Sequence, residues 1–199
     1  MLTDEMLAKQ TLHGKLSAFE ELIERYKNIV FSVVYRILGQ YQEAEDVTQE
    51  VFITVYEKMY QFDSSRRFGP WINRIAVNTC VTYLRKNRKV ITLSFDETAG
   101  KQYELPYRVA YTDDPELVFE KAELKQEIDA ALMELSESYR LIIIMRFRME
   151  LNNQEIAEIL GISKENVEVK VHRARKALRK IILRKWKERG LQYELPANK

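Results

Sequence analysis

Residues 152–175 have the sequence NNQEIAEILGISKENVEVKVHRAR, a pattern typical of two short helices joined by a tight turn. In the first helix, Ile156, Ile159 and Leu160 recur at spacings of three and four residues and form one apolar face. Gly161 is expected to close this helix, because glycine adopts the left-handed conformation at little steric cost. We therefore expect a helix-turn-helix in the C-terminal part of the chain.

Polar residues are placed to cap both helices, and basic residues cover the outer face of the second. Asn153 is expected to cap the first helix and Ser163 the second, since a short side-chain oxygen can accept a bond from a first-turn N–H. An apolar stripe runs along the second helix and consists of Val167, Val171, Ala174 and Leu178. Away from this stripe lies a basic face, made of Lys170, His172, Arg173, Arg175 and Lys176. A helix that enters the major groove of DNA requires such a face. The alternative is an ordinary helical hairpin with a solvated basic surface.

The composition favours an all-α protein and excludes several functional classes. Of the 199 residues 46% are hydrophobic, and only 6 are Gly and 4 Pro, too few for a turn-rich β architecture. One Cys and 2 His are too few for a disulfide framework or a zinc finger, so we expect no metal and no cofactor. No glycine-rich phosphate loop or Ser/His/Asp order is visible, which argues against an enzyme. Without a signal peptide or a bilayer-length apolar run, we expect a cytoplasmic protein with no stable membrane insertion.

The net charge of +2 conceals a strong alternation along the chain. Counting Lys and Arg against Asp and Glu, residues 1–61 carry −4, residues 62–90 carry +6, residues 91–135 carry −7 and residues 136–199 carry +7. Two basic blocks, one of them on the helix-turn-helix, indicate two contacts with one polyanion.

Apolar periodicity predicts further helices on the N-terminal side. One contains Phe19 to Leu38 and ends at Gly39, one begins near Gln42 and continues to Met59, and one runs from Trp71 to about Asn87. Ser136 is expected to start another, with Met145 and Phe147 among its core residues. We predict two helical domains joined by a linker: an N-terminal domain at 1–90, an acidic linker at 91–112, and a C-terminal domain at 113–199. Within the last, Asp114-Pro115-Glu116 is expected to open a helix.

Aromatic residues precede the third of these N-terminal helices. Phe62, Phe68 and Trp71 are interleaved with arginine and asparagine, a combination that suits single-stranded nucleic acid. The alternative is that these three aromatics belong to the core. Cys80 lies on the expected buried side of the helix and is interpreted as a small core residue.

Three stretches together resemble the extracytoplasmic function (ECF) sigma factors of bacterial RNA polymerase, in the sigma-70 family. Residues 42–52, QEAEDVTQEVF, are similar to the acidic helix with which that family grips core polymerase. Residues 68–79, FGPWINRIAVNT, look like its helix for the promoter −10 element, and Leu135 to Arg175 looks like its −35 reader. The resemblance covers roughly residues 15–90 and 113–185 and leaves the linker unmatched.

The resemblance implies roles for named residues. Asp46, Gln49 and Glu50 match the polymerase-docking positions, although their charge alone could serve solubility. The residues expected to act at the −10 element are Asn78, which would bind a flipped base, with Trp71, Arg74 and the loop residues Ser64, Arg66 and Arg67. In the −35 reader, Glu168, Val169, His172 and Arg173 match base-facing positions, and Lys170 and Arg175 lie near the DNA backbone.

One departure from the family pattern concerns specificity at the −35 element. Where the family usually has Gly-Thr-Val-Lys-Ser-Arg, this chain has ENVEVK at residues 165–170. The carboxylate of Glu168 can accept a hydrogen bond from the cytosine amino group but cannot donate one to guanine. We therefore expect a −35 preference that differs from that of relatives with a basic residue there.

The expected function is that of a sigma factor, which binds core RNA polymerase, recognises the −10 and −35 elements and helps to open the promoter. The implied partners are core RNA polymerase, promoter DNA and an anti-sigma factor. The alternative is a conventional helix-turn-helix transcriptional regulator. Such a regulator would need neither the acidic docking helix nor the helix that carries Asn78.

Overall fold

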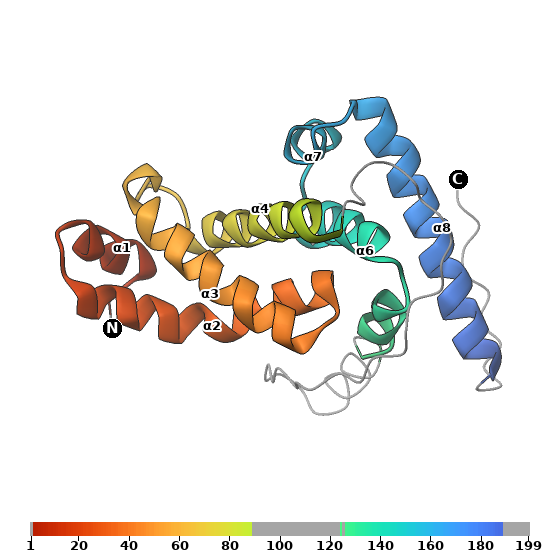
Figure 1. Ribbon diagram of the computed structural model, residues 1–199, viewed down its shortest axis with the longest axis horizontal. Helices are drawn as coiled ribbons and strands as arrows, with labels where there is room; N and C mark the ends of the chain where they lie inside the picture. Colours follow the sequence, from red (N-terminus) through yellow and green to blue (C-terminus); the bar gives the residue numbers. More distant parts are fainter. Residues whose placement is uncertain (1, 89–123, 125, 189–199) are drawn as a thin grey trace.

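In the computed structural model, which describes residues 2–88, 124 and 126–188, every regular element is a helix. The N-terminal region consists of α1 (Asp4–Leu12), α2 (Leu16–Leu38), α3 (Tyr41–Glu57), a 3-10 turn η1 (Met59–Gln61) and α4 (Phe68–Arg88). The C-terminal region consists of helical residues 126–133, α6 (Glu137–Ile143), a π-helical turn η2 (Ile144–Arg148), α7 (Asn153–Leu160) and α8 (Lys164–Glu188). The all-α prediction is confirmed (Figure 1). The expected linker at 91–112 and the helix expected to open at 114–116 lie outside the described residues.

The long helix α2 organises the N-terminal region, because it packs against α1, α3 and α4 (Figure 1). Its apolar face supplies Leu22, Val30 and Val34, which are at most 1% exposed. As predicted, Gly39 ends α2 in the left-handed conformation, with φ of 80°. Burial of this face keeps the helix in place, since apolar side chains contribute about 1.5–3 kcal/mol each when they leave water.

The helix-turn-helix forms as predicted, with one correction to its first cap. Asn152, not Asn153, caps α7: its Oδ1 accepts the N–H of Gln154 at 2.9 Å and that of Glu155 at 3.0 Å. The Glu155 carboxylate in turn accepts the N–H of Asn152 at 2.9 Å. This reciprocal capping box needs an acid three residues after the cap, and Asn153 has Ile156 there.

The remaining signals of the helix-turn-helix are confirmed. Gly161 closes α7 with φ of 62°, and the Ser163 hydroxyl accepts the N–H of Asn166 at 3.2 Å. Along α8, Val167 and Ala174 are fully buried. These residues fix the second helix on the first, so its opposite side faces solvent.

Phe147 was predicted as a core residue, but its side chain is 54% exposed. The helix changes here from α6 into the π-turn η2, in which Met149 N–H bonds Ile144 O at 3.1 Å. A π-turn adds a residue to the helical repeat and rotates the following side chains out of register. Phe147 therefore points outward, although the α-helical spacing placed it beneath Ile144.

The two regions contact each other through three arginines. Arg36 of α2 forms a two-pronged ion pair with Asp129, with N–O distances of 2.8 and 2.9 Å. Arg85 of α4 donates to the Leu160 carbonyl at the end of α7 at 2.7 Å. The third, Arg140 of α6, is 3% exposed and donates to the Leu38 carbonyl at 3.4 Å. Besides these polar contacts, buried residues of both regions belong to one hydrophobic core among the described residues. None of the helices in the described ranges is long and apolar enough to cross a membrane.

Candidate nucleic-acid interface

An exposed acidic face runs along α3. Asp46, Gln49 and Glu50 are all exposed, while Val47 and Val51 on the opposite side are at most 1% exposed. The spacing of three and four residues places the three polar side chains on one face of the helix. The structure therefore brings together the residues predicted to dock on polymerase.

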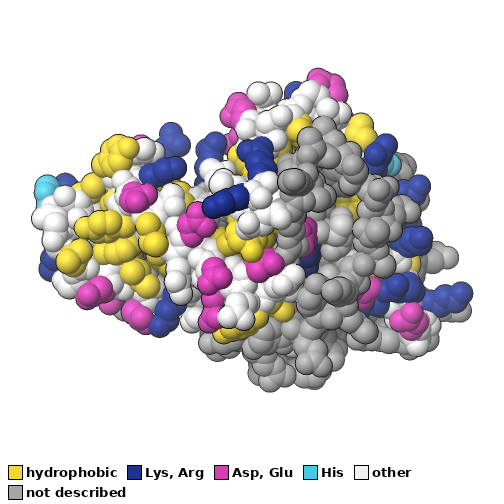
Figure 2. Space-filling view, in the orientation of Figure 1, with side chains coloured by type: hydrophobic (Ala, Val, Ile, Leu, Met, Phe, Trp, Pro, Cys, Tyr) yellow, Lys and Arg dark blue, Asp and Glu magenta, His cyan; other side chains and the backbone are white. Residues whose placement is uncertain are grey.

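Ile53 extends the same face and was missed by the sequence argument. It lies three residues after Glu50 and is 60% exposed, an unusual position for a large apolar side chain. The signal was available, because the inward positions of α3 follow Val47, Val51 and Val55 and leave Ile53 outside. Figure 2 shows hydrophobic side chains gathered at the end of the molecule formed by α1, α2 and α3. A protein-binding surface usually has an apolar centre with a polar rim, and Ile53 beside polar side chains fits that arrangement.

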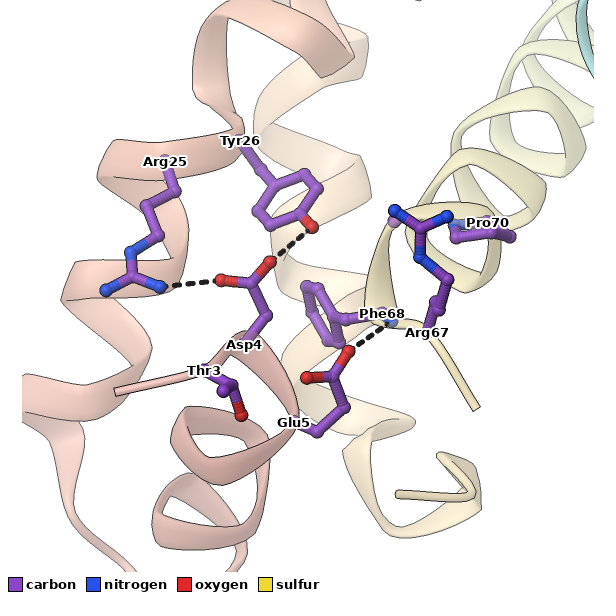
Figure 3. A pocket seen from close by; sticks show the side chains of 9 residues that line it. Thr3, Asp4, Glu5, Arg25, Tyr26, Arg67, Phe68 and Pro70 are labelled. Carbon is purple, nitrogen blue, oxygen red and sulfur yellow. Dashed lines mark hydrogen bonds and ion pairs between the residues drawn. The ribbon is translucent and has the colours of Figure 1, made fainter. Parts of the chain in front are cut away.

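The N-terminus of α4 is held by α1, at a hollow of about 410 Å³ (Figure 3). The Glu5 carboxylate accepts the N–H of Phe68 at 3.3 Å and so caps α4 from another helix. Its own backbone N–H and that of Phe68 lower the pKa of Glu5. Beside it, Asp4 accepts from Arg25 and from the Tyr26 hydroxyl, both at 2.7 Å. These contacts begin α4 at Phe68, earlier than the predicted start at Trp71.

The loop before α4 presents the predicted polar residues to solvent. Ser64, Arg66 and Arg67 are all exposed. The Asp63 carboxylate accepts the N–H of Ser65 at 3.0 Å and its hydroxyl at 2.7 Å, and these bonds lower the pKa of Asp63. An Asx turn of this kind gives the loop a defined shape.

The aromatic residues around this loop are mainly core residues. Phe62 is 7% and Phe68 1% exposed, and their rings meet edge to face with centroids 5.2 Å apart. Trp71 is half-buried and packs on both, with centroid distances of 5.1 and 5.5 Å. Of the three, only Trp71 keeps a surface that a base could contact, so the core interpretation holds for Phe62 and Phe68.

The exposed side of α4 carries Arg74, Asn78 and Arg85. Asn78 is the fourth residue after Arg74, so the two side chains lie on one face of the helix, about one turn apart. The opposite side is buried and includes Ile72, Ala76 and Cys80, each 0% exposed. The burial of Cys80 confirms its interpretation as a core residue, and it also raises the pKa of the thiol.

The outer face of α8 displays the residues predicted to read the −35 element. Glu168, Val169, His172, Arg173 and Arg175 are exposed, and Val169 is 48% exposed. Lys170 is half-buried, and burial together with the nearby Arg173 lowers its pKa. Because a helix in the major groove contacts bases through its first turns, the position of Glu168 early in α8 suits base contact.

The described residues contain no group of three or more His, Cys, Asp or Glu side chains that could hold a metal ion. The candidate surfaces are instead polar and charged faces on α3, α4 and α8, with one apolar residue on each of α3 and α8. Such faces bind macromolecules through shape and charge.

Comparison with known proteins identifies two matching family models. The model described as "Sigma-70 region 2" matches residues 22–90, which include α3 and α4. The model described as "Sigma-70, region 4" matches residues 125–178, which include the helix-turn-helix.

Curated relatives match nearly the whole chain. It is 36% identical over 174 residues to "ECF RNA polymerase sigma factor SigW" of Bacillus subtilis (strain 168), a match that covers 86% of this chain and 92% of the relative. It is 31% identical over 178 residues to "ECF RNA polymerase sigma-E factor" of Escherichia coli (strain K12), covering 89% and 93% of the two chains.

A solved structure shares the fold. It is a co-crystal of the sigma factor RpoE with the anti-sigma factor NepR from Bartonella quintana, with a TM-score of 0.51 and 19% identity. The match covers 82% of this chain and 96% of that one. The two family models match separate parts of the chain, region 2 before region 4, and the curated relatives span both parts. The chain belongs to the extracytoplasmic function sigma factors of the sigma-70 family.

Proposed function

We propose that this sigma factor divides its work among three surfaces, with core polymerase bound by α3, the −10 element by α4 and its preceding loop, and the −35 element by α8. The observation that carries the proposal is the exposure of each predicted set on a separate helix whose other side is buried. The domains would be residues 1–90 for docking and −10 reading, 91–112 as linker, and 113–199 for −35 reading. Its work would be binding without catalysis, in the cytoplasm, where polymerase meets the chromosome.

An anti-sigma factor is a further proposed partner. The sigma factor RpoE of Bartonella quintana was crystallised with such a protein, NepR. A binder that covers α3 or α8 would prevent docking or promoter reading, because each surface is used directly.

The docking surface is tested by reversing its charge. Asp46→Lys with Glu50→Lys should weaken binding to core polymerase at least about tenfold, because like charges placed across an interface cost several kcal/mol. The matched control is Glu20→Lys with Glu24→Lys, which makes the same change at the same spacing on exposed positions of α2. Equal losses in the two proteins, measured by fluorescence anisotropy, would contradict the assignment of α3.

The −35 specificity is tested at Glu168. Glu168→Lys should change the preferred −35 sequence, with discrimination of about 1–3 kcal/mol per affected base pair, since lysine donates where glutamate accepts. The measurement is transcription from a promoter library randomised at −35. Glu158→Lys, an equal change of charge on the exposed side of α7, serves as the control. A uniform change across all promoters would show that Glu168 does not read a base.

Promoter reading would also require the two regions to separate. Asn78 lies seven residues before Arg85, roughly 10 Å along α4, and Glu168 lies eight residues after Leu160, at most about 29 Å. The bond from Arg85 to Leu160 therefore holds the two reading positions within roughly 50 Å of each other. Elements named −10 and −35 are separated by roughly 25 base pairs, or about 85 Å of duplex at about 3.4 Å per pair.

This separation is measurable with a fluorophore pair at the exposed residues Lys86 of α4 and Lys176 of α8. The distance between the fluorophores should lengthen by roughly 30 Å when core polymerase and promoter are added, given the reach of the closed form. An unchanged distance in a transcribing complex would refute the proposed opening.

A further inference from the structure

An apolar groove of about 560 Å³ lies on the C-terminal region, and of the residues predicted to contact −35 DNA, Arg175 is among those that line it. It runs between Leu124 and residues 126–133 on one side, the end of α6 with η2 on another, and α8. Its apolar lining is Leu124, Ile128, Leu132, Ile143, Ile144, Phe147, Leu178 and Ile182. Leu124 is 50% and Phe147 54% exposed, so large apolar side chains face solvent here. A groove of this size and lining fits a short segment with apolar side chains.

Polar contacts near one end of the groove link two of its walls, α8 and residues 126–134, and so fix the spacing between them. Lys185 pairs with Glu134 at 2.6 Å, and Arg184 pairs with the same carboxylate. The indole N–H of Trp186 donates to Glu127 at 3.1 Å. The last turns of α8 are thereby fixed to residues 126–134, and the groove exists before anything binds in it.

The charges around the groove select the chemistry of its ligand. Arg148, Arg175 and Arg179 border it, and among the described lining residues Asp129 is the one carboxylate. Asp129 pairs with Arg36 at 2.8 Å and also with Arg148 of this border at 3.7 Å. A complementary ligand would therefore carry a carboxylate among apolar side chains.

The sequence contains such a segment twice. The pentapeptide QYELP occurs at residues 102–106 and again at residues 192–196. Each copy offers a tyrosine and a leucine two positions apart, which lie on one side of an extended chain, with a glutamate between them. The proline disfavours a helical conformation of the leucine before it. The repeat therefore supplies two candidate segments with the chemistry that the groove would accept.

We propose that the C-terminal copy, residues 192–196, docks in this groove, with Tyr193 and Leu195 on its apolar lining and Glu194 on its arginine border. The chain between the end of α8 and residue 192 is long enough for this segment to reach the groove. Ile182 lies about 9 Å back along α8 from Glu188, and the four residues from Glu188 to Gln192 span up to about 14 Å. The copy in the linker ends 18 residues before Leu124, so closing its longer loop costs more entropy. The C-terminal copy therefore has the higher effective concentration at the groove.

The test uses cysteine pairs in the full-length chain. Cys80, the one natural cysteine, is 0% exposed, so introduced thiols react selectively. Leu195→Cys with Phe147→Cys should form an intramolecular disulfide in most molecules under mild oxidation, read by mass spectrometry. Leu105→Cys with Phe147→Cys tests the linker copy, and Leu195→Cys with Tyr60→Cys is the control, since Tyr60 is 72% exposed on the other region.

Each outcome supports or overturns the proposal, which shares only Arg175 with the residues assigned to promoter reading. A dominant Leu105 pair would make the linker copy the occupant, and disulfide-linked dimers would make it a second chain; either result overturns the proposal. Equal yields in the test and control pairs would overturn it as well.

Charge exchange provides a second measurement: Arg179→Glu should reduce the yield of the Leu195–Phe147 disulfide severalfold, and adding Glu194→Lys should restore it. Failure of that restoration also counts against the proposed pairing.

Discussion

Asn78→Ala is expected to reduce open-complex formation about tenfold to a hundredfold while leaving the fold and the binding of core polymerase unchanged. A side-chain amide offers one acceptor and two donors, so it can pair with the edge of an extruded base. Loss of a paired base contact costs about 1–3 kcal/mol, and the base must still be unstacked at a cost of a few kcal/mol. The exposure of Asn78 allows the truncation without opening a cavity.

The matched control for Asn78 is Asn87→Ala, the same change at another exposed position of α4. Promoter opening is followed by the fluorescence of a base analogue placed in the −10 element. If Asn87→Ala lowers opening as much as Asn78→Ala, the loss reflects the helix as a whole, and Asn78 is not the base-binding residue.

Gly39→Ala is expected to lower the stability of the protein far more than Gly14→Ala. The two glycines have nearly the same backbone conformation, with φ of 80° and 82°. Alanine in the left-handed region costs about 1–2 kcal/mol at either position. At Gly14 an added Cβ would meet no atom within 4 Å, whereas at Gly39 it would lie 2.6 Å from Nη1 of Arg140.

The guanidinium of Arg140 has little room to move away from residue 39. Its side chain is 3% exposed between the two regions, with Nη1 3.5 Å from the Met133 sulfur. Overpacking typically adds about 1–3 kcal/mol, and each kcal/mol shifts the Tm of a chain this size by about 2–4 °C. Thermal unfolding followed by circular dichroism measures both variants. Equal shifts would show that Arg140 does not press on Gly39.

The elements that sequence predicts best are those with local signals. The apolar stripe of α8, the left-handed closure at Gly161 and the cap at Ser163 are all encoded within a few residues. The identity of the residue that caps α7 is also encoded locally, since Asn152 has an acid three residues later and Asn153 does not. The exposed faces of α3 and α4 follow from the same periodicity, which is why the candidate residues emerged from sequence at all.

What sequence does not predict depends on partners that are distant along the chain. Glu5 starts α4 from 63 residues away, and Arg36 meets Asp129 across 93 residues. Arg140 is buried because its guanidinium packs against Gly39 and donates to the Leu38 carbonyl, and both residues are distant from it in sequence. The prediction that Phe147 is buried is wrong for a different reason. A π-turn breaks the α-helical repeat on which that prediction depended.

The most direct test of the sigma-factor account is in vitro transcription with core RNA polymerase and a library of promoter fragments. The account predicts that the protein directs initiation from a defined set of promoters with common −10 and −35 sequences. It also predicts that the protein alone binds the same duplexes weakly. Initiation from no promoter, together with tight binding to duplex DNA without polymerase, would contradict it and identify a conventional helix-turn-helix regulator.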